Sequence, residues 1–227
     1  MDYHLLKMFP NPIKNIEAEN KAMIKKIQFA HIVMLFLLAI CLILSGVRPF
    51  DRTTWVLEIF PILIALPILF LTYNNFRLTQ LLYFFIFIHM LILILGGAYS
   101  YARVPLGFAI QDWLHLSRNP YDKIGHFFQG FVPALIAREI LIRKDIVDGR
   151  KMLAFIVCSI VLAISATYEL IEWAAALMLQ QGAEEFLGTQ GDMWDTQSDM
   201  FLALVGAVVA LIGFTKIHDK QIRKLHQ

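Results

Sequence analysis

The sequence predicts an all-α fold, a polytopic membrane helical bundle with about six transmembrane helices. Of the 227 residues, 58% are hydrophobic and only 17% are charged, and the mean hydropathy of +0.62 lies above that of soluble domains. The apolar residues form six continuous stretches, each near the roughly 20 residues that a spanning helix needs. The stretches lack the period-two alternation of membrane β-strands, so helices are the structure that satisfies their backbone hydrogen bonds.

The predicted spans follow one another along the chain as residues 27–46, 54–73, 79–98, 124–142, 152–178 and 198–217. The first begins after 26 mostly polar residues and ends without a small-residue cleavage pattern, which predicts a retained span and not a signal peptide. Residues 104–116 are too few to span, and we expect them to lie along the outer interface. The whole chain, 1–227, is predicted to be a single integral membrane domain with short cytoplasmic tails at 1–26 and 218–227.

The basic residues predict the orientation in the membrane. With the N-terminus inside, 15 of the 20 lysines and arginines fall on the inner side. The five on the outer side are Arg48, Arg52, Arg103, Arg118 and Lys123. This positive-inside asymmetry and the even number of spans place both termini in the cytoplasm, so we expect a multi-pass protein of a bacterial inner (plasma) membrane. With a net charge of +2 and two cysteines, neither a nucleic-acid-binding domain nor a disulfide-stapled fold is expected.

The acidic residues have the opposite bias. On or near the outer side lie 11 of the 18, namely Asp51, Glu58, Asp112, Asp122, Glu169, Glu172, Glu184, Glu185, Asp192, Asp195 and Asp199. An ionisable group at membrane depth costs about 3 kcal/mol, so such groups usually face a cavity or a partner. The sequence therefore predicts a polar cluster near the outer leaflet.

Helical spacing sorts this cluster into three polar stripes. Side chains at i, i+3, i+4 and i+7 share one face of a helix. The stripes are Asp122, His126 and Gln129, then Glu169 and Glu172, then Asp192, Asp195 and Asp199. Three helices are thus expected to present polar side chains at one depth.

Such a cluster has three chemical uses. Carboxylates with one histidine can hold magnesium, calcium, manganese or zinc. Alternatively, the histidine acts as general base or acid while a carboxylate orients its other ring nitrogen. In the third use, the crowding of carboxylates keeps one of them protonated, so that it acts as an acid. We expect the catalytic residues to be His126, Glu169, Glu172, Asp195 and Asp199, with Asp122, Lys123, Gln129 and Asp192 binding substrate. If the cofactor is a divalent metal ion, its candidate ligands are His126, Glu172, Asp195 and Asp199.

Structural roles are the alternative for several polar residues. In this alternative, Asp122 merely caps the fourth span and Asp195 or Asp199 caps the sixth, because a negative charge complements the helix dipole at an N-terminus. Lone histidines in apolar spans, His31 and His89, more often form interhelical hydrogen bonds. Arg138, near the inner end of the fourth span, is expected to snorkel to the cytoplasmic surface.

Three motifs carry a family resemblance. They are residues 121–131 (YDKIGHFFQGF), 168–173 (YELIEW) and 188–200 (GTQGDMWDTQSDM). Over nearly its full length the chain resembles the YjdF-type family of uncharacterised bacterial inner-membrane proteins. That resemblance implies a multi-pass membrane protein without assigning an activity.

A more distant resemblance is to the VanZ-like proteins. The matching residues are Asp122, Lys123, His126, Phe127, Glu172, Asp199 and Gly206. VanZ-like proteins usually have an asparagine four residues after the aspartate, where this chain has Ala203. By analogy alone, the resemblance implies a membrane enzyme acting on lipid head groups or lipid-linked cell-wall intermediates.

We therefore expect hydrolysis or group transfer at lipid or polyprenyl-phosphate head groups at the outer leaflet, with membrane lipids as partners. The alternatives are a proton- or cation-coupled transporter and a non-catalytic lipid-binding membrane protein. The acids are gathered on one side and no inverted repeat is visible, which weighs against transport. The sequence carries no signal for the oligomeric state.

Overall fold

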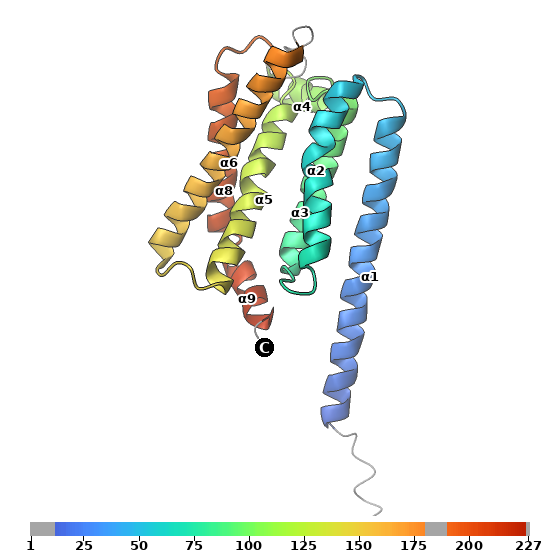
Figure 1. The fold of residues 1–227 in the computed structure, drawn as a ribbon, viewed down its shortest axis with the longest axis vertical. Helices are drawn as coiled ribbons and strands as arrows, with labels where there is room; N and C mark the ends of the chain where they lie inside the picture. Colours follow the sequence, from blue (N-terminus) through green and yellow to red (C-terminus); the bar gives the residue numbers. More distant parts are fainter. Residues whose placement is uncertain (1–11, 180–189, 226–227) are drawn as a thin grey trace, which may run out of the picture. The chain divides into compact units, whose positions relative to one another are not determined.

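The computed structural model describes residues 12–179 and 190–225, and every regular element within these ranges is an α-helix. The helices are α1 (Pro12–Val47), α2 (Arg52–Thr72), α3 (Gln80–Tyr99), α4 (Pro105–Leu114), α5 (Tyr121–Arg143), α6 (Arg150–Leu179), α8 (Asp195–Gly213) and α9 (Thr215–Leu225) (Figure 1). The chain separates into two compact units, residues 1–39 and 40–227, and the second contains α2 to α9. The predicted all-α fold is confirmed.

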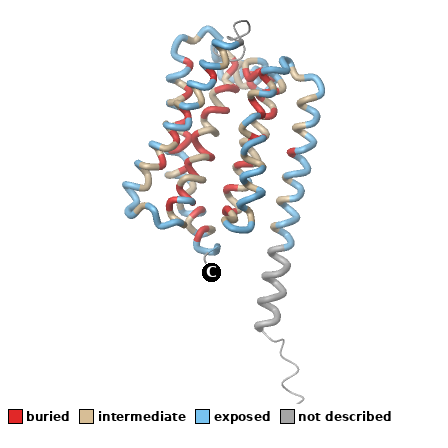
Figure 2. The backbone as a smooth tube through the Cα atoms, viewed as in Figure 1, coloured by how far each residue is buried: buried red, intermediate tan, exposed pale blue. Residues whose placement is uncertain are grey.

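Within the described parts of the chain, five helical segments are long and apolar enough to cross a membrane: Lys25–Val47, Arg52–Thr72, Gln80–Tyr99, Arg150–Met178 and Asp195–Gly213. The predicted span 124–142 falls within α5, whose 23 residues suffice in length but include many polar side chains. The helix packs against α8, α6 and α3, so these side chains face protein and not lipid. Figure 2 shows buried residues along the whole of α5, from Tyr121 to Leu141.

The predicted span 198–217 runs past the end of its helix. Helix α8 ends at Gly213, and the residues that follow form the separate amphipathic helix α9. Its apolar face is buried through Ile222, and His218 is completely buried. Residues 218–225 of the predicted cytoplasmic tail are therefore part of a packed helix.

Helix α2 begins where Asp51 caps it. The Asp51 carboxylate accepts a hydrogen bond from the backbone N–H of Thr54 at 2.7 Å. This backbone hydrogen bond lowers the pKa of Asp51, so the cap stabilises the helix above the ordinary carboxyl pKa and is lost as the pH falls through the lowered one. The cap fixes the start of the helix that carries Glu58 two turns later.

Helices α5 and α8 approach each other closely because glycines occupy their contact. A Cβ atom on Gly130 would overlap the backbone carbonyl of Ala203, and one on Gly206 would overlap the carbonyl of Phe127. Ala203, where the sequence departs from the VanZ-like pattern, is fully buried at this contact. Small residues at such positions are the usual means by which membrane helices pack backbone to backbone.

The end of the bundle that carries α9 is held by a buried network around Glu139, which is fully buried. Its carboxylate accepts hydrogen bonds from the N–H and hydroxyl of Thr79 and pairs with His218 Nε2 at 2.9 Å. Arg138 lies beside it, 5% exposed, and pairs with Asp219. The expected snorkelling of Arg138 is wrong, because its charge is satisfied inside the protein.

Replacing Gly206 by alanine is predicted to destabilise the protein by about 1–3 kcal/mol, because the added methyl group must push α5 and α8 apart. Thermal unfolding of the purified protein in detergent measures the loss. Gly213→Ala is the matched control, since a Cβ atom there meets nothing within 4 Å. Equal melting temperatures for the two variants would contradict the close contact.

Candidate functional site

The site is centred on His126, one turn into α5. Its Nε2 atom lies 3.6 Å from Oδ1 of Asp122, which precedes it by one turn of α5. The same atom lies 3.9 Å from Oδ2 of Asp199 in α8. Its Nδ1 atom lies 2.9 Å from Gln129 Oε1 and 3.9 Å from Glu169 Oε1 of α6. One imidazole thus has carboxylates from three helices around it.

Each of the three polar stripes contributes at least one residue beside this histidine. Ligand atoms of Asp122, His126 and Asp199 all lie within 4.8 Å of one another, and the same holds for His126, Glu169 and Glu172. The residues are removed from solvent: His126 is 6% exposed, Glu172 9% and Asp199 2%. Glu172 and Asp199 thus belong to two groups that share His126.

Several carboxylate oxygens of this cluster lack hydrogen-bond partners. Among the described residues, Asp122 Oδ2, Glu169 Oε1 and Asp199 Oδ1 are buried and accept no hydrogen bond. A buried polar atom without a partner costs about 1–3 kcal/mol, and more when it is charged. The cluster therefore stores free energy that a bound ion, a proton or a ligand can release.

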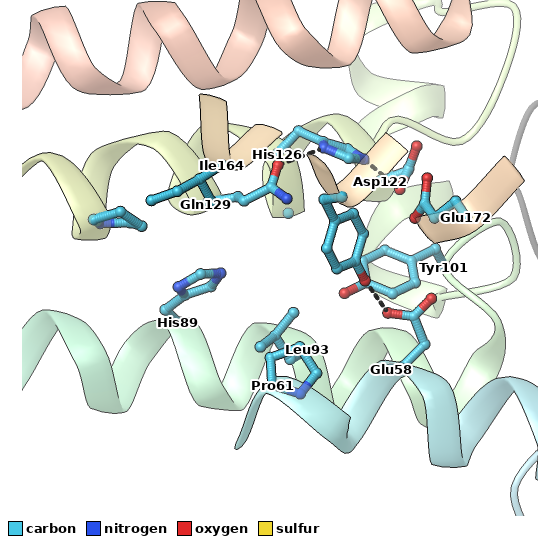
Figure 3. Close-up of a pocket in the computed structure, with 13 residues that line it drawn as sticks. Glu58, Pro61, His89, Leu93, Tyr101, Asp122, His126, Gln129, Ile164 and Glu172 are labelled. Carbon is cyan, nitrogen blue, oxygen red and sulfur yellow. Dashed lines mark hydrogen bonds and ion pairs between the residues drawn. The ribbon is translucent and has the colours of Figure 1, made fainter. Parts of the chain in front are cut away.

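The cluster borders a cavity of about 190 Å³ (Figure 3). Its lining includes Asp122, His126, Gln129 and Glu172, together with Glu58 from α2. Figure 3 shows Glu58 across the cavity from His126. The hydroxyl of Tyr168 donates to Glu58 Oε2 at 3.4 Å. We call this space the polar cavity.

Tyr101 forms part of the cavity wall. It follows α3 with a positive φ of 33°, and its ring packs over Gly96 and Gly125, where any larger side chain would collide with it. Burial raises the pKa of the Tyr101 hydroxyl well above its ordinary value, and the neighbouring Glu58 carboxylate acts in the same direction. The phenol therefore remains a hydrogen-bond donor at neutral pH.

Asp192 and Asp195 lie apart from the histidine. Arg118, from the segment between α4 and α5, forms ion pairs with both of them, at 3.1 Å with Asp192. Asp192 also accepts from the N–H of Trp194 just before α8. Asp195, expected as a catalytic residue and metal ligand, is therefore held by arginine in the structure.

Only some of the predicted substrate-binding residues line the polar cavity. Asp122 and Gln129 line the polar cavity. Lys123 donates to Ser198 Oγ at 2.7 Å, so its ammonium group joins α5 to α8 beside the cavity. Glu184, Glu185 and the first two residues of the motif 188–200 lie outside the described residues.

Sequence reasoning did not include four cavity residues in the site: Glu58, His89, Tyr101 and Tyr168. Glu58 had a signal, since it is an acid inside an apolar span. His89, taken for a structural residue, has no hydrogen-bond partner at Nε2 among the described residues and lines the cavity. Nothing in the local sequence marks Tyr101, because its position depends on the close approach of α3 and α5.

Fold and site together define a polytopic helical membrane protein with a buried polar centre. The chain belongs to the family described as predicted membrane protein (DUF2238), which matches residues 30–220. It is 57% identical over 187 residues to the inner membrane protein YjdF of Escherichia coli (strain K12), covering 82% of this chain and 90% of that protein. No solved structure matches the chain. The YjdF-type family and the inner-membrane localisation are confirmed, while the VanZ-like resemblance stays a prediction.

Arg118→Ala is predicted to destabilise the protein by about 3 kcal/mol, because it leaves the buried Asp195 without its partner. Arg118→Lys should recover part of the loss. Thermal unfolding in detergent is the measurement, with Arg52→Ala as the control, since Arg52 is exposed. A loss no larger than that of the control would show that Asp195 does not depend on Arg118.

Proposed function

We propose that this protein is a membrane-embedded enzyme that hydrolyses or transfers the head group of a membrane lipid. The observation that carries the proposal is the continuity of two cavities. The polar cavity adjoins an apolar cavity of about 550 Å³, within the range of about 300–1,000 Å³ of small-molecule sites. Both are lined by Pro61, His89, Leu93 and Pro133. A lipid has the same two parts, a polar head joined to a hydrocarbon chain.

The lining of α5 changes character along a single stripe. Towards its N-terminus the lining residues are Asp122, His126 and Gln129, and further along they are Val132, Ile136 and Ile140. At 1.5 Å per residue, the 11 residues from Gln129 to Ile140 span about 17 Å. This is close to half of the roughly 30 Å hydrocarbon thickness of a bilayer, the depth that one leaflet's acyl chains occupy. The length of the apolar cavity therefore supports a phospholipid.

The side chains around the polar cavity suit hydrolysis of a phosphoester. The oxygen of water forms a bond to phosphorus, and the bond from phosphorus to the leaving oxygen breaks. The proton lost by water is passed to that leaving oxygen. Glu169 and Glu172 are the carboxylates that can accept and return this proton, with His126 between them and Asp199. In group transfer an acceptor hydroxyl takes the place of water.

The positive-inside distribution supports an outer-leaflet site, because the polar cavity lies at the end of the bundle opposite the basic inner loops. Phosphate needs a positive group nearby, and two basic residues at this end of the bundle are already engaged. Arg118 is paired with Asp192 and Asp195, and Lys123 is bonded to Ser198. The positive charge for the phosphate must then come from another source.

His126→Ala and Asp199→Asn are predicted to reduce lipid turnover by about 10²-fold or more, because each removes a group at the reacting centre. Purified protein in liposomes of bacterial lipid extract, followed by lipid mass spectrometry, gives the measurement. His115→Ala and Asp112→Asn are exposed control substitutions of the same types and should leave turnover unchanged. Unchanged lipids with the wild-type protein, together with an ion flux that Asp199→Asn abolishes, would favour transport instead.

Ala65→Phe is predicted to lower turnover of long-chain lipids while leaving the protein folded, because Ala65 of α2 lines the apolar cavity and phenylalanine would fill it. Leu63→Phe adds an aromatic ring to the same helix at a side chain that is 47% exposed, and serves as control. Turnover is compared between long-chain and short-chain phospholipids. Equal rates for both variants on both lipids would contradict a hydrocarbon chain in this cavity.

A further inference from the structure

We propose that Asp122, His126 and Asp199 bind a divalent transition-metal ion such as Mn²⁺ or Zn²⁺. The ion would supply the positive charge that the polar cavity otherwise lacks. Its use in catalysis rests on the proposed function, but its binding does not and can be measured without any lipid.

The three side chains are arranged as metal ligands are. Asp122 and His126 stand at i and i+4 on α5, a spacing that puts two ligands on one helix face. Asp199 supplies the third ligand from α8, and the three ligand atoms lie within 4.8 Å of one another. Around a tetrahedral ion with bonds near 2.1 Å, ligand atoms are about 3.4 Å apart. Side-chain rotations that move the ligand atoms by roughly 1 Å suffice to reach that geometry.

An independent observation points to a ligand at this position. Asp199 is 2% exposed, yet its Oδ1 atom accepts no hydrogen bond among the described residues. Asp122 Oδ2 is in the same condition. A buried carboxylate oxygen without a hydrogen bond costs about 1–3 kcal/mol, and more when the group is charged. A cation bound between the two carboxylates would remove that cost.

The hydrogen bond of Gln129 prepares His126 for the ion. Gln129 Oε1 lies 2.9 Å from Nδ1, and in the neutral imidazole this carbonyl oxygen, which can only accept, favours the tautomer whose Nδ1 donates to it. The lone pair then remains on Nε2, the atom that faces Asp122 and Asp199. Metal-bound histidines usually donate their other N–H to an acceptor in this manner. Gln129 is thus a positioning residue.

The same hydrogen bond decides between the two groups that could hold a metal. Glu169 faces Nδ1, which in that tautomer carries the proton and cannot coordinate. Glu169 and Glu172 are therefore placed beside the ion as free carboxylates and not as its ligands. The imidazole ligand favours a transition metal over magnesium or calcium, which prefer oxygen alone.

The test is binding of Mn²⁺ to purified, chelator-treated full-length protein in detergent, with free Mn²⁺ followed by electron paramagnetic resonance and Zn²⁺ added as competitor. We expect one Mn²⁺ per chain for the wild-type protein. Asp199→Asn and His126→Ala should each weaken binding at least 10-fold. Gln129→Leu should weaken it about 10- to 100-fold, while Gln129→Glu, which keeps the acceptor, should bind like the wild type.

His115→Ala and Asp112→Asn are the matched controls and should not change binding. Thermal unfolding identifies variants that fail to fold, and the near-isosteric Asp199→Asn and Gln129→Leu keep the test valid if His126→Ala is unstable. The proposal is overturned if the wild-type protein shows no saturable binding, or if folded Asp199→Asn binds as tightly as the wild type.

Failure of this inference differs from failure of the proposed function. Tight Mn²⁺ binding without lipid turnover would leave the metal site standing and remove the enzyme. Lipid turnover by metal-free protein in excess chelator would leave the enzyme standing and remove the ion's use in catalysis, whereas absence of saturable Mn²⁺ binding would remove the metal site itself.

Discussion

The contact between α5 and α8 is the constraint on which the site depends. Both helices run from the end with the polar cavity towards the end with α9. In each helix the residue at the contact follows the residue at the site by four positions. His126 and Asp199 stand one turn before Gly130 and Ala203, whose backbones touch. The register that lets glycine meet alanine therefore also sets the imidazole opposite the carboxylate. A helix displacement that relieves one pair would separate the other.

Polar groups gather at both ends of the bundle, but their surroundings differ. At the α9 end, Glu139 receives hydrogen bonds from Thr79, His218 and Arg143, so its charge is fully satisfied. At the other end, carboxylates of Asp122 and Asp199 keep oxygens without partners. Buried charge that is satisfied holds helices together, whereas buried charge that is not satisfied is unfavourable without a ligand. The cluster around Glu139 therefore stabilises the fold without a ligand, whereas the cluster around His126 would be stabilised by binding one.

Local spacing predicted part of this arrangement well. Asp122, His126 and Gln129 share a helix face whatever the tertiary structure, and the structure places them around one cavity. Helical spacing does not extend to Asp192, because α8 begins only at Asp195, and it could not predict the ion pairs of Asp192 and Asp195 with Arg118. It could not include Glu58 or Tyr101, since these join the cavity through the packing of α2, α3 and α5. Membrane spans follow from composition, whereas contacts between spans do not.

The buried position of His218 has a consequence for the order in which the chain assembles. Helix α9 is synthesised after the helices it contacts, and until it is present Glu139 lacks the imidazole that pairs with it inside the protein. Arg138 likewise has to wait for Asp219. The preceding helices can insert as they leave the ribosome, but this end of the bundle closes only after α9 has been synthesised and has folded back against α5.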